Sequence, residues 1–170
     1  MTDQKRFVLI EILIVVAVIG LIGTLSAVAV ASARANTRDA TRLAQVRQMQ
    51  SALEDFFVQN NTYPVSDNVL ALGFGEAACL DTEGFHAACE AGASGVLAKA
   101  IPVALGTGLD GLATCGGAAN AFCYSAANQG AAYGIIFELE NAIPLAKLQK
   151  GLNCATPEGM KPEACSFANE

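Results

Sequence analysis

The chain has six cysteines, which could either bind a metal ion or form disulfides. Thiolates can bind zinc, but the sequence has no C-x-x-C motif and only one histidine, His86, so a zinc site is disfavoured. An even number of cysteines, all in the C-terminal part of the chain, predicts disulfides instead if that part is exported. Six cysteines allow 15 pairings, and the sequence does not choose among them. The simplest pairing joins sequence neighbours: Cys79 with Cys89, Cys115 with Cys123, and Cys154 with Cys165.

A single carboxylate, that of Glu11, interrupts an otherwise apolar run over residues 7–20. From Ile12 to Ala33 the chain then has 22 residues without a charge, which as an α-helix extend about 33 Å, enough to cross a bilayer core. The run is longer than the apolar part of a cleaved secretory signal. A carboxylate at mid-membrane costs roughly 2.5–3.5 kcal/mol on insertion scales. Glu11 is therefore expected to reach the interface or to pair with a cation.

Other chemistry has little support in the sequence. His86 lacks a Ser or Cys partner motif, and there is no G-x-S-x-G. The acid pairs Asp81/Glu83 and Glu138/Glu140 fit solvated loop or strand positions. We therefore expect no enzyme, no catalytic residue, no cofactor and no metal ion.

Charge is distributed unevenly along the chain. Residues 1–63 hold six basic and five acidic side chains, a net charge of +1, whereas residues 64–170 hold four basic and eleven acidic ones, a net charge of −7. An acidic domain argues against nucleic-acid binding, because neutralising phosphates requires clustered Lys or Arg. Arg34, Arg38 and Arg42 form a stripe at helical spacing, which we expect on a solvated or intersubunit face.

The elements that position these residues begin with a helix predicted from about residue 8 to residue 61. Gly23, Ala27 and Ala31 form a ridge of small residues that lets helices approach closely, and Gly20 and Gly23 each weaken the helix by about 0.8–1.0 kcal/mol relative to alanine. Tyr63-Pro64 is predicted to end the helix. The second half carries an apolar stripe typical of core packing, formed by Leu43, Val46, Met49, Leu53, Phe56 and Phe57.

Residues 64–170, here called the head, follow the helix. Residues 65–117 are rich in Gly, Ala and Ser, which predicts a long loop region held by disulfides and short helical turns. Residues 121–125 and 133–140 have the composition of strands, and a polar turn around Asn128-Gln129-Gly130 separates them. These two segments predict an antiparallel hairpin.

The chain begins with a basic leader, a phenylalanine, three apolar residues and a glutamate: Lys5, Arg6, Phe7, Val8, Leu9, Ile10 and Glu11. With this signature, the N-terminal third of the chain resembles type IV pilins and the related pseudopilins. Residues 32–35, 37–40 and 60–64 extend the resemblance, and residues 151–157 are similar to a C-terminal stretch of these proteins.

The resemblance implies an α+β fold, in which a long N-terminal helix packs on a small antiparallel sheet within a disulfide-stapled head. Its parts would be a leader (residues 1–6), a transmembrane or filament-core helix (7–35), the amphipathic half of that helix (36–63) and the head (64–170). The implied function is that of the major subunit of an extracellular pilus, a helical homo-oligomer. Its partners would be the membrane before assembly, a prepilin peptidase and the pilus assembly machinery.

Cleavage of the leader would take place between Arg6 and Phe7 of the signature. The family's leader ends in glycine, where the peptidase cuts, and this chain has Arg6 there. Cleavage after Arg6 would leave Phe7 as a methylated N-terminus, with Glu11 pairing to the amine of a neighbouring subunit. Without cleavage, a membrane-anchored subunit that does not polymerise is expected.

Alternatives to a major pilin are a minor pilin, a secretion pseudopilin, or a monomeric membrane-anchored binding protein. The positive-inside rule would place the head in the cytoplasm, because four arginines follow the apolar run and only Lys5 and Arg6 precede it. The cysteines and the resemblance favour a head outside the cell, because cytosolic thiols stay reduced.

Overall fold

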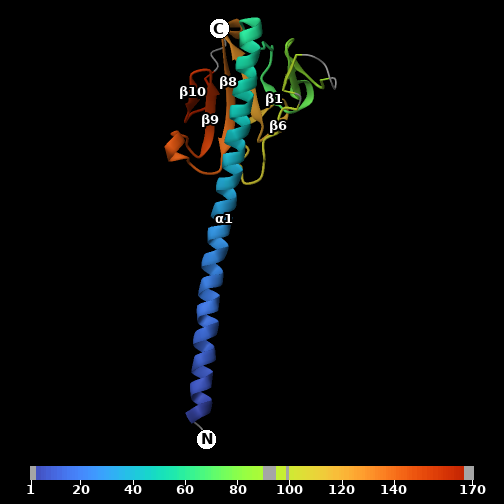
Figure 1. The fold of residues 1–170 in the computed structure, drawn as a ribbon. Coiled ribbons are helices and arrows are strands. Elements are labelled where there is room, and N and C mark those ends of the chain that lie inside the picture. The colour runs from blue at the N-terminus through green and yellow to red at the C-terminus, as the bar shows by residue number, and fades with distance from the viewer. Residues whose placement is uncertain (1–2, 90–94, 99, 167–170) are drawn as a thin grey trace. The chain divides into compact units, whose positions relative to one another are not determined.

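The computed structural model describes residues 3–89, 95–98 and 100–166, with the side chains of residues 3–9 left aside. The chain divides into two compact units, Met1–Thr37 and Arg38–Glu170 (Figure 1). Met1 and Thr2 of the predicted leader lie outside the described residues.

Helix α1 spans Asp3–Asn60, so it begins five residues before the predicted start. Gly20 and Gly23 do not interrupt it. In the first unit its apolar side chains between Ile10 and Val30 are exposed. Among the described residues, α1 is the one helix long and apolar enough to cross a membrane.

The helix ends at Asn60, within one residue of the predicted end at residue 61, but before Tyr63-Pro64, which was expected to end it. Asn61 adopts a left-handed backbone with φ of 56°, and its N–H donates to the Phe57 carbonyl at 2.7 Å. Asparagine tolerates this conformation better than most residues, and a left-handed residue after the last helical one is a common helix stop. The helix therefore ends before the position at which Pro64 would prevent it from continuing.

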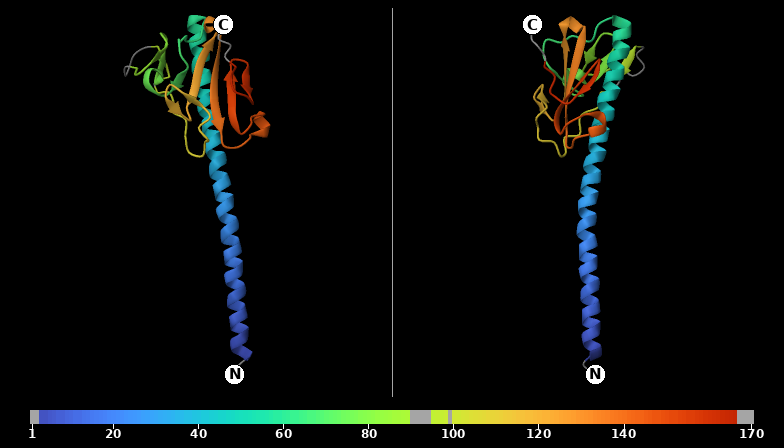
Figure 2. Two further views of the ribbon diagram at one scale, coloured as in Figure 1. Left: turned by 180° about the vertical axis from the view of Figure 1, so that it is seen from behind. Right: turned by 90° about the vertical axis from the view of Figure 1, so that its left-hand side faces the viewer.

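In the second unit, residues 38–60 of α1 pack on a five-stranded antiparallel sheet (Figure 2). The strand order is β1-β7-β8-β9-β10. The predicted hairpin is confirmed, because β7 and β8 pair with Cys123 opposite Ile136, and η2 (Asn128–Gly130) forms their turn. The strands are β1 (Leu70–Leu72), β7 (Phe122–Ala127), β8 (Ala132–Leu139), β9 (Gly151–Thr156) and β10 (Gly159–Lys161).

The apolar stripe of α1 forms one side of the core, as predicted. Val46, Met49 and Leu53 are fully buried, Leu43 and Phe56 nearly so, and Phe57 packs against them. The sheet contributes the other side through Phe122, Tyr124, Ile135, Phe137 and Leu139. Burial of this stripe is what joins the second half of the helix to the head.

Residues 65–117 contain more regular structure than the predicted loop. A second sheet has the order β3-β2-β4, and a two-stranded sheet joins β5 and β6. Strands of two or three residues are too short to show alternation in a sequence, which explains why the prediction missed them. The added elements are β2 (Cys79–Asp81), β3 (Phe85–His86), β4 (Val96–Ala98), β5 (Thr114–Cys115), β6 (Ala118–Ala119), η1 (Gly75–Ala77) and, later in the chain, η3 (Pro144–Ala146).

The cysteines pair with their sequence neighbours, which confirms the simplest of the possible pairings. Each bridge closes a short loop of the head, across Cα separations of 5.0 to 5.9 Å. In the chain-entropy picture each loop of this size adds about 2–3 kcal/mol of stability. The bridges are Cys79–Cys89, Cys115–Cys123 and Cys154–Cys165.

Candidate functional site

The first candidate site is the apolar half of α1. The Glu11 side chain is exposed. Within the part of the chain whose side chains are described, it makes no hydrogen bond or ion pair. Arg6 and Phe7 lie in the helical backbone, and their side chains are outside the described set. Glu11 is thus an exposed carboxylate, and the apolar side chains that follow it on the helix, from Ile12 to Val30, are exposed as well.

The small residues of α1 leave room for a close neighbour. Gly20, Gly23, Ala27 and Ala31 are all exposed. A Cβ placed on Gly20 or Gly23 would meet no atom within 4 Å. Small residues at this spacing allow another helix backbone to come close in a membrane or in a helix bundle.

The second candidate site is a charge network centred on Arg42, which corrects the expectation that the arginine stripe is solvated. Arg42 is fully buried, and only Arg34 of the stripe is exposed. Arg42 Nη1 lies 2.7 Å from Asp39 Oδ1 and 2.8 Å from Glu140 Oε1. The rest of its guanidinium donates to backbone carbonyls, with Nε 2.9 Å from Leu105 O and Nη2 2.6 Å from Thr107 O.

Arg38 completes the network with two parallel hydrogen bonds to Glu140. Its Nε and Nη2 donate to Oε1 and Oε2, each at 2.6 Å. The Arg38 hydrogen bonds, aided by Arg42 and opposed by burial, lower the pKa of Glu140 from 4.5 to about 2. In return, the Glu140 carboxylate raises the pKa of Arg38. Glu140 therefore stays ionised throughout the neutral range.

Asp39 ties the same part of the helix to the end of β8. Its carboxylate accepts hydrogen bonds from the backbone N–H groups of Glu140 and Asn141, each at 2.9 Å. Asp39 is 1% exposed, so it is a buried charge that Arg42 and these two donors satisfy. The network thus holds α1, the end of β8 and the segment around residues 105–107 together.

Glu138 also differs from its predicted solvated position. It is 3% exposed, and its carboxylate accepts from the backbone N–H groups of Asp110, Leu112 and Ala113 at 2.7, 2.8 and 3.4 Å. These bonds anchor residues 110–113 to β8. Glu138 and Glu140 are therefore structural carboxylates of the head.

A signal for the network was present in the sequence. Asp39 precedes Leu43 by four residues, and Arg42 precedes Val46 by four, so both are in step with the apolar stripe. Extending the helical period backwards would have placed both charges on the buried face. Their acidic partner, Glu140, lies about a hundred residues away, and nothing local points to it.

The remaining predicted residues lie in the head. The six cysteines are bonded in pairs, so none is a free thiol. His86 lies on β3, and its Nε2 is 3.1 Å from Asp81 Oδ1.

Comparisons were made with protein-family models, with curated proteins and with solved structures, and none of the three found a match. The fold and the two candidate sites are therefore what bears on function. They define a chain with a membrane-capable helix and a disulfide-closed α+β unit in which an antiparallel sheet packs on the end of that helix.

Proposed function

We propose that this chain is a type IV pilin-like subunit that assembles through its apolar helix into an extracellular filament. The observation that carries the proposal is the lone carboxylate of Glu11 on an exposed apolar helix that continues into the core of an α+β head. An exposed apolar surface of this length requires either lipid or other helices around it. A filament core supplies the helices, and the membrane supplies the lipid before assembly.

Glu11 is proposed to pair with the N-terminal amine of a neighbouring subunit. Prepilin peptidase would create that amine by cutting between Arg6 and Phe7, and Phe7 would then be methylated. Opposite charges attract more strongly where water is excluded, so a carboxylate inside an apolar bundle fixes the register of its neighbour. Gly20, Gly23, Ala27 and Ala31 would allow the helices to approach closely.

A second function is favoured by one specific residue. Arg6 stands where the family has the glycine at which the peptidase cuts. An uncut chain keeps its basic leader and lacks the amine at Phe7. Such a chain would be a membrane-anchored protein with an external head that binds a ligand.

Shearing the producing cells and imaging the released material separates these functions. Mass spectrometry of the sheared fraction identifies the dominant subunit and its N-terminal peptide. Thin filaments made mainly of this chain and beginning at Phe7 support a major pilin. Trace amounts in filaments indicate a minor pilin, and full retention in membranes with residues 1–6 present contradicts the filament proposal.

The Glu11→Ala variant tests the proposed register contact. We expect it to abolish filaments while the head keeps its three disulfides, because the substitution lies in the other unit. Asp55→Ala is the matched control, since Asp55 is an exposed carboxylate on the same helix. Normal filaments from Glu11→Ala would show that the proposed pairing is wrong.

A further inference from the structure

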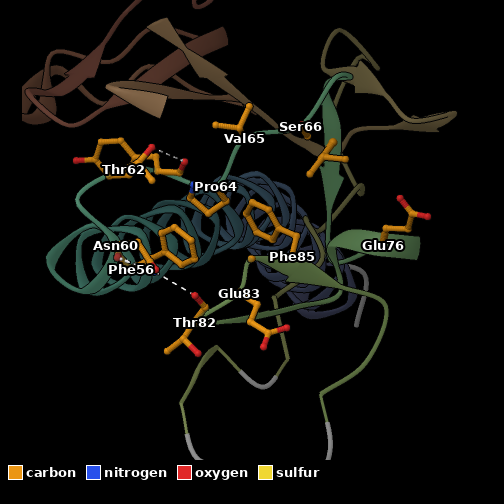
Figure 3. A pocket seen from close by; sticks show the side chains of 13 residues that line it. Phe56, Asn60, Thr62, Pro64, Val65, Ser66, Glu76, Thr82, Glu83 and Phe85 are labelled. Atoms are coloured by element: carbon orange, nitrogen blue, oxygen red, sulfur yellow. Dashed lines mark hydrogen bonds between the residues drawn. The ribbon is translucent and has the colours of Figure 1, made fainter. Parts of the chain in front are cut away.

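A cleft of about 560 Å³ lies in the second unit, where α1 ends. The side chains around it come from five segments (Figure 3): Phe56 and Asn60 from α1, residues 62–66 after the helix, Leu70 from β1, Glu76 from η1, and residues 82–85 from the β2–β3 turn and the start of β3. Its volume is within the range of small-molecule sites. The cleft lies wholly outside the apolar half of α1, so binding there would not depend on filament assembly.

The walls of the cleft are held in place by bonds within the protein. The Asn60 amide donates to Thr82 O at 3.1 Å, which joins the helix end to the β2–β3 turn. The Tyr124 hydroxyl donates to Pro64 O at 2.7 Å. The ring of Phe85 packs edge-on against Tyr124, with centroids 4.9 Å apart. A ligand would therefore meet a preorganised surface, which reduces the entropy lost on binding.

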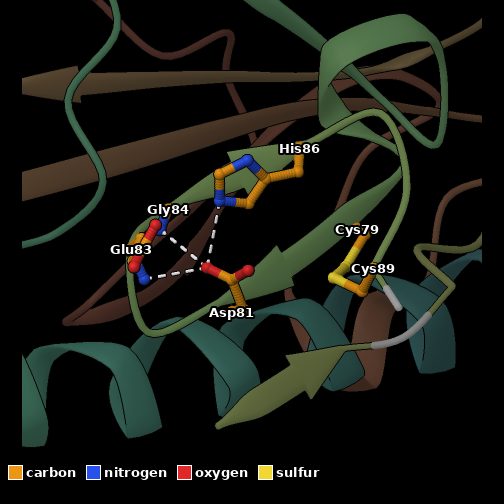
Figure 4. Close-up of a disulfide and its surroundings, with 6 residues drawn as sticks. All are labelled: Cys79, Asp81, Glu83, Gly84, His86 and Cys89. Carbon is orange, nitrogen blue, oxygen red and sulfur yellow. Dashed lines mark hydrogen bonds and ion pairs between the residues drawn. A yellow bond between two sulfur atoms is a disulfide. The ribbon is translucent and has the colours of Figure 1, made fainter. Parts of the chain in front are cut away.

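The β2–β3 turn itself is braced on both sides. The Asp81 carboxylate accepts from the backbone N–H groups of Glu83 and Gly84 at 2.8 and 3.2 Å, and it also lies near the His86 ring (Figure 4). The Cys79–Cys89 bridge closes the loop that contains this turn. The turn that carries Thr82 and Glu83 is thus fixed in position.

Asn60, Ser66 and Thr62 of the cleft use their donors within the protein, whereas the Thr82 hydroxyl makes no side-chain hydrogen bond within the described residues. Both hydrogens of the Asn60 amide go to the carbonyls of Phe56 and Thr82. The Ser66 hydroxyl donates to Asn68 O at 2.6 Å, and the Thr62 hydroxyl lies 3.3 Å from Gly130 O. What these side chains offer a ligand is acceptor oxygen. Glu76 and Glu83, which are both exposed, add two carboxylates that only accept.

The charge and the apolar surface of the cleft further limit the class of ligand that it could bind. None of the residues that line the cleft, in the described part of the chain, is a lysine, arginine or histidine. An anionic ligand would therefore lack a cation to bind. The half-buried Phe85 ring and the exposed Val65 provide an apolar wall. A ligand that fits brings several hydrogen-bond donors, an apolar face and no negative charge.

We propose that this cleft binds a neutral saccharide. A sugar ring has a face of C–H groups, whose partly positive hydrogens pack on the negative face of an aromatic ring. Its rim carries hydroxyl groups, which donate hydrogen bonds. The hydroxyls would meet the acceptors of Asn60, Ser66, Glu76 and Glu83, and the C–H face would lie against Phe85. Exposed carboxylates in water attract a cation only weakly, which disfavours a simple amine as the ligand.

The test uses the full chain in micelles of a zwitterionic detergent that has no sugar group. A glycan array that carries neutral, sialylated and sulfated glycans, together with methylated amines, identifies which class binds. Saturation-transfer NMR on the best neutral glycan then gives the affinity. We expect neutral glycans to bind and the charged probes to be rejected.

Variants of the cleft connect binding to the named residues. The Glu76→Gln/Glu83→Gln double variant should weaken binding about fivefold or more, because it removes the charged acceptors without touching the core. Phe85→Leu should weaken it about tenfold, and the double variant provides the test if Phe85→Leu fails to fold. Glu163→Gln, which changes a carboxylate in a separate cavity, should leave affinity unchanged. Failure of every neutral glycan to bind, binding of charged probes only, or equal affinity in the double variant would each overturn the proposal.

Discussion

At the scale of single residues, the least expected feature is the buried arginine of α1. Burying a charge is costly, and Arg42 is tolerated because every donor of its guanidinium that the structure describes meets an oxygen. Asp39 and Glu140 are satisfied in turn by Arg42, Arg38 and backbone N–H groups. The network requires the helix and the end of β8 to meet in one relative position, which apolar packing alone specifies less sharply.

Removing the central cation should destabilise the second unit strongly. Arg42→Ala removes a cation from the buried Asp39 and from the partly buried Glu140, and we expect the free energy of unfolding to fall by about 3–5 kcal/mol. Arg47→Ala is the control, because Arg47 is exposed on the same helix, and its effect should stay within about 0.5 kcal/mol. Denaturant unfolding of the full chain in micelles, followed by tyrosine circular dichroism, measures both. Equal effects would contradict a structural role for Arg42.

The lowered pKa of Glu140 predicts a specific acid sensitivity. Its pKa is 4.5 ordinarily and about 2 in the folded chain, so its contribution to stability is fully present above pH 4.5. That contribution should be lost as the pH falls from 4.5 through 2. Glu140→Gln should therefore be less stable at pH 7 and show a shallower loss of stability between pH 4.5 and 2. Glu76→Gln, at an exposed position, should keep the wild-type slope; a wild-type slope in Glu140→Gln would contradict the assignment.

At the scale of elements, α1 has two halves with different surroundings. From Ile10 to Val30 its apolar residues are exposed, and from Leu43 to Phe56 they are buried against the sheet. The first half can be satisfied only by lipid or by other chains, whereas the second is satisfied within the chain. The left-handed Asn61 ends the second half and turns the chain into the segment that lines the cleft.

The helix stop at Asn61 can be tested by substitution. Asn61→Gly should keep the stability of the wild type, because glycine adopts a left-handed backbone without steric cost. Asn61→Val should lower the free energy of unfolding by about 1–2 kcal/mol, because its branched side chain crowds the backbone there. Thermal unfolding of the two variants side by side gives the difference. If the valine and glycine variants are equally stable, Pro64 and not Asn61 is the effective stop.

At the scale of the whole molecule, acidic and apolar surfaces belong to different parts of the chain. The net charge of −6 arises entirely in the head, and the exposed apolar stretch lies in the first unit. Net negative charge keeps a domain soluble, and it repels other copies of itself at long range. Association of copies would therefore have to be driven through the apolar helix, in line with the proposed assembly.

Whether the leader is cleaved before Phe7 can be tested directly by a substitution at Arg6. Arg6→Gly introduces the residue that type IV pilins have before their cleavage point. If the chain is a substrate of prepilin peptidase, this variant should increase the fraction of chains that begin at Phe7, as read by mass spectrometry of the N-terminal peptide. Arg34→Gly, which changes an exposed arginine elsewhere on α1, controls for the loss of charge. No gain of processing in Arg6→Gly would argue for an anchored, uncut protein.

The elements that could be predicted are those whose signals are local. The apolar run and its lone carboxylate, the stripe from Leu43 to Phe56 and the β7–β8 hairpin all result from spacing within about twenty residues. The short strands between residues 70 and 119 gave no such signal. The helix end was predicted to within one residue, but its cause was not: the prediction relied on Tyr63-Pro64, whereas the left-handed backbone of Asn61 ends the helix.

The sequence by itself determined that this chain has a membrane-capable helix, an acidic head and an even number of cysteines confined to that head, because these depend on composition and on short-range spacing. Only the tertiary structure decided that Arg42 is buried, that Glu138 and Glu140 are structural, and that Phe85, Asn60 and Ser66 surround one cleft. Arg38 and Glu140 are separated by 102 positions along the chain. Contacts over such distances depend on how the sheet is ordered and packed against the helix, and no local pattern encodes which partners that packing brings together.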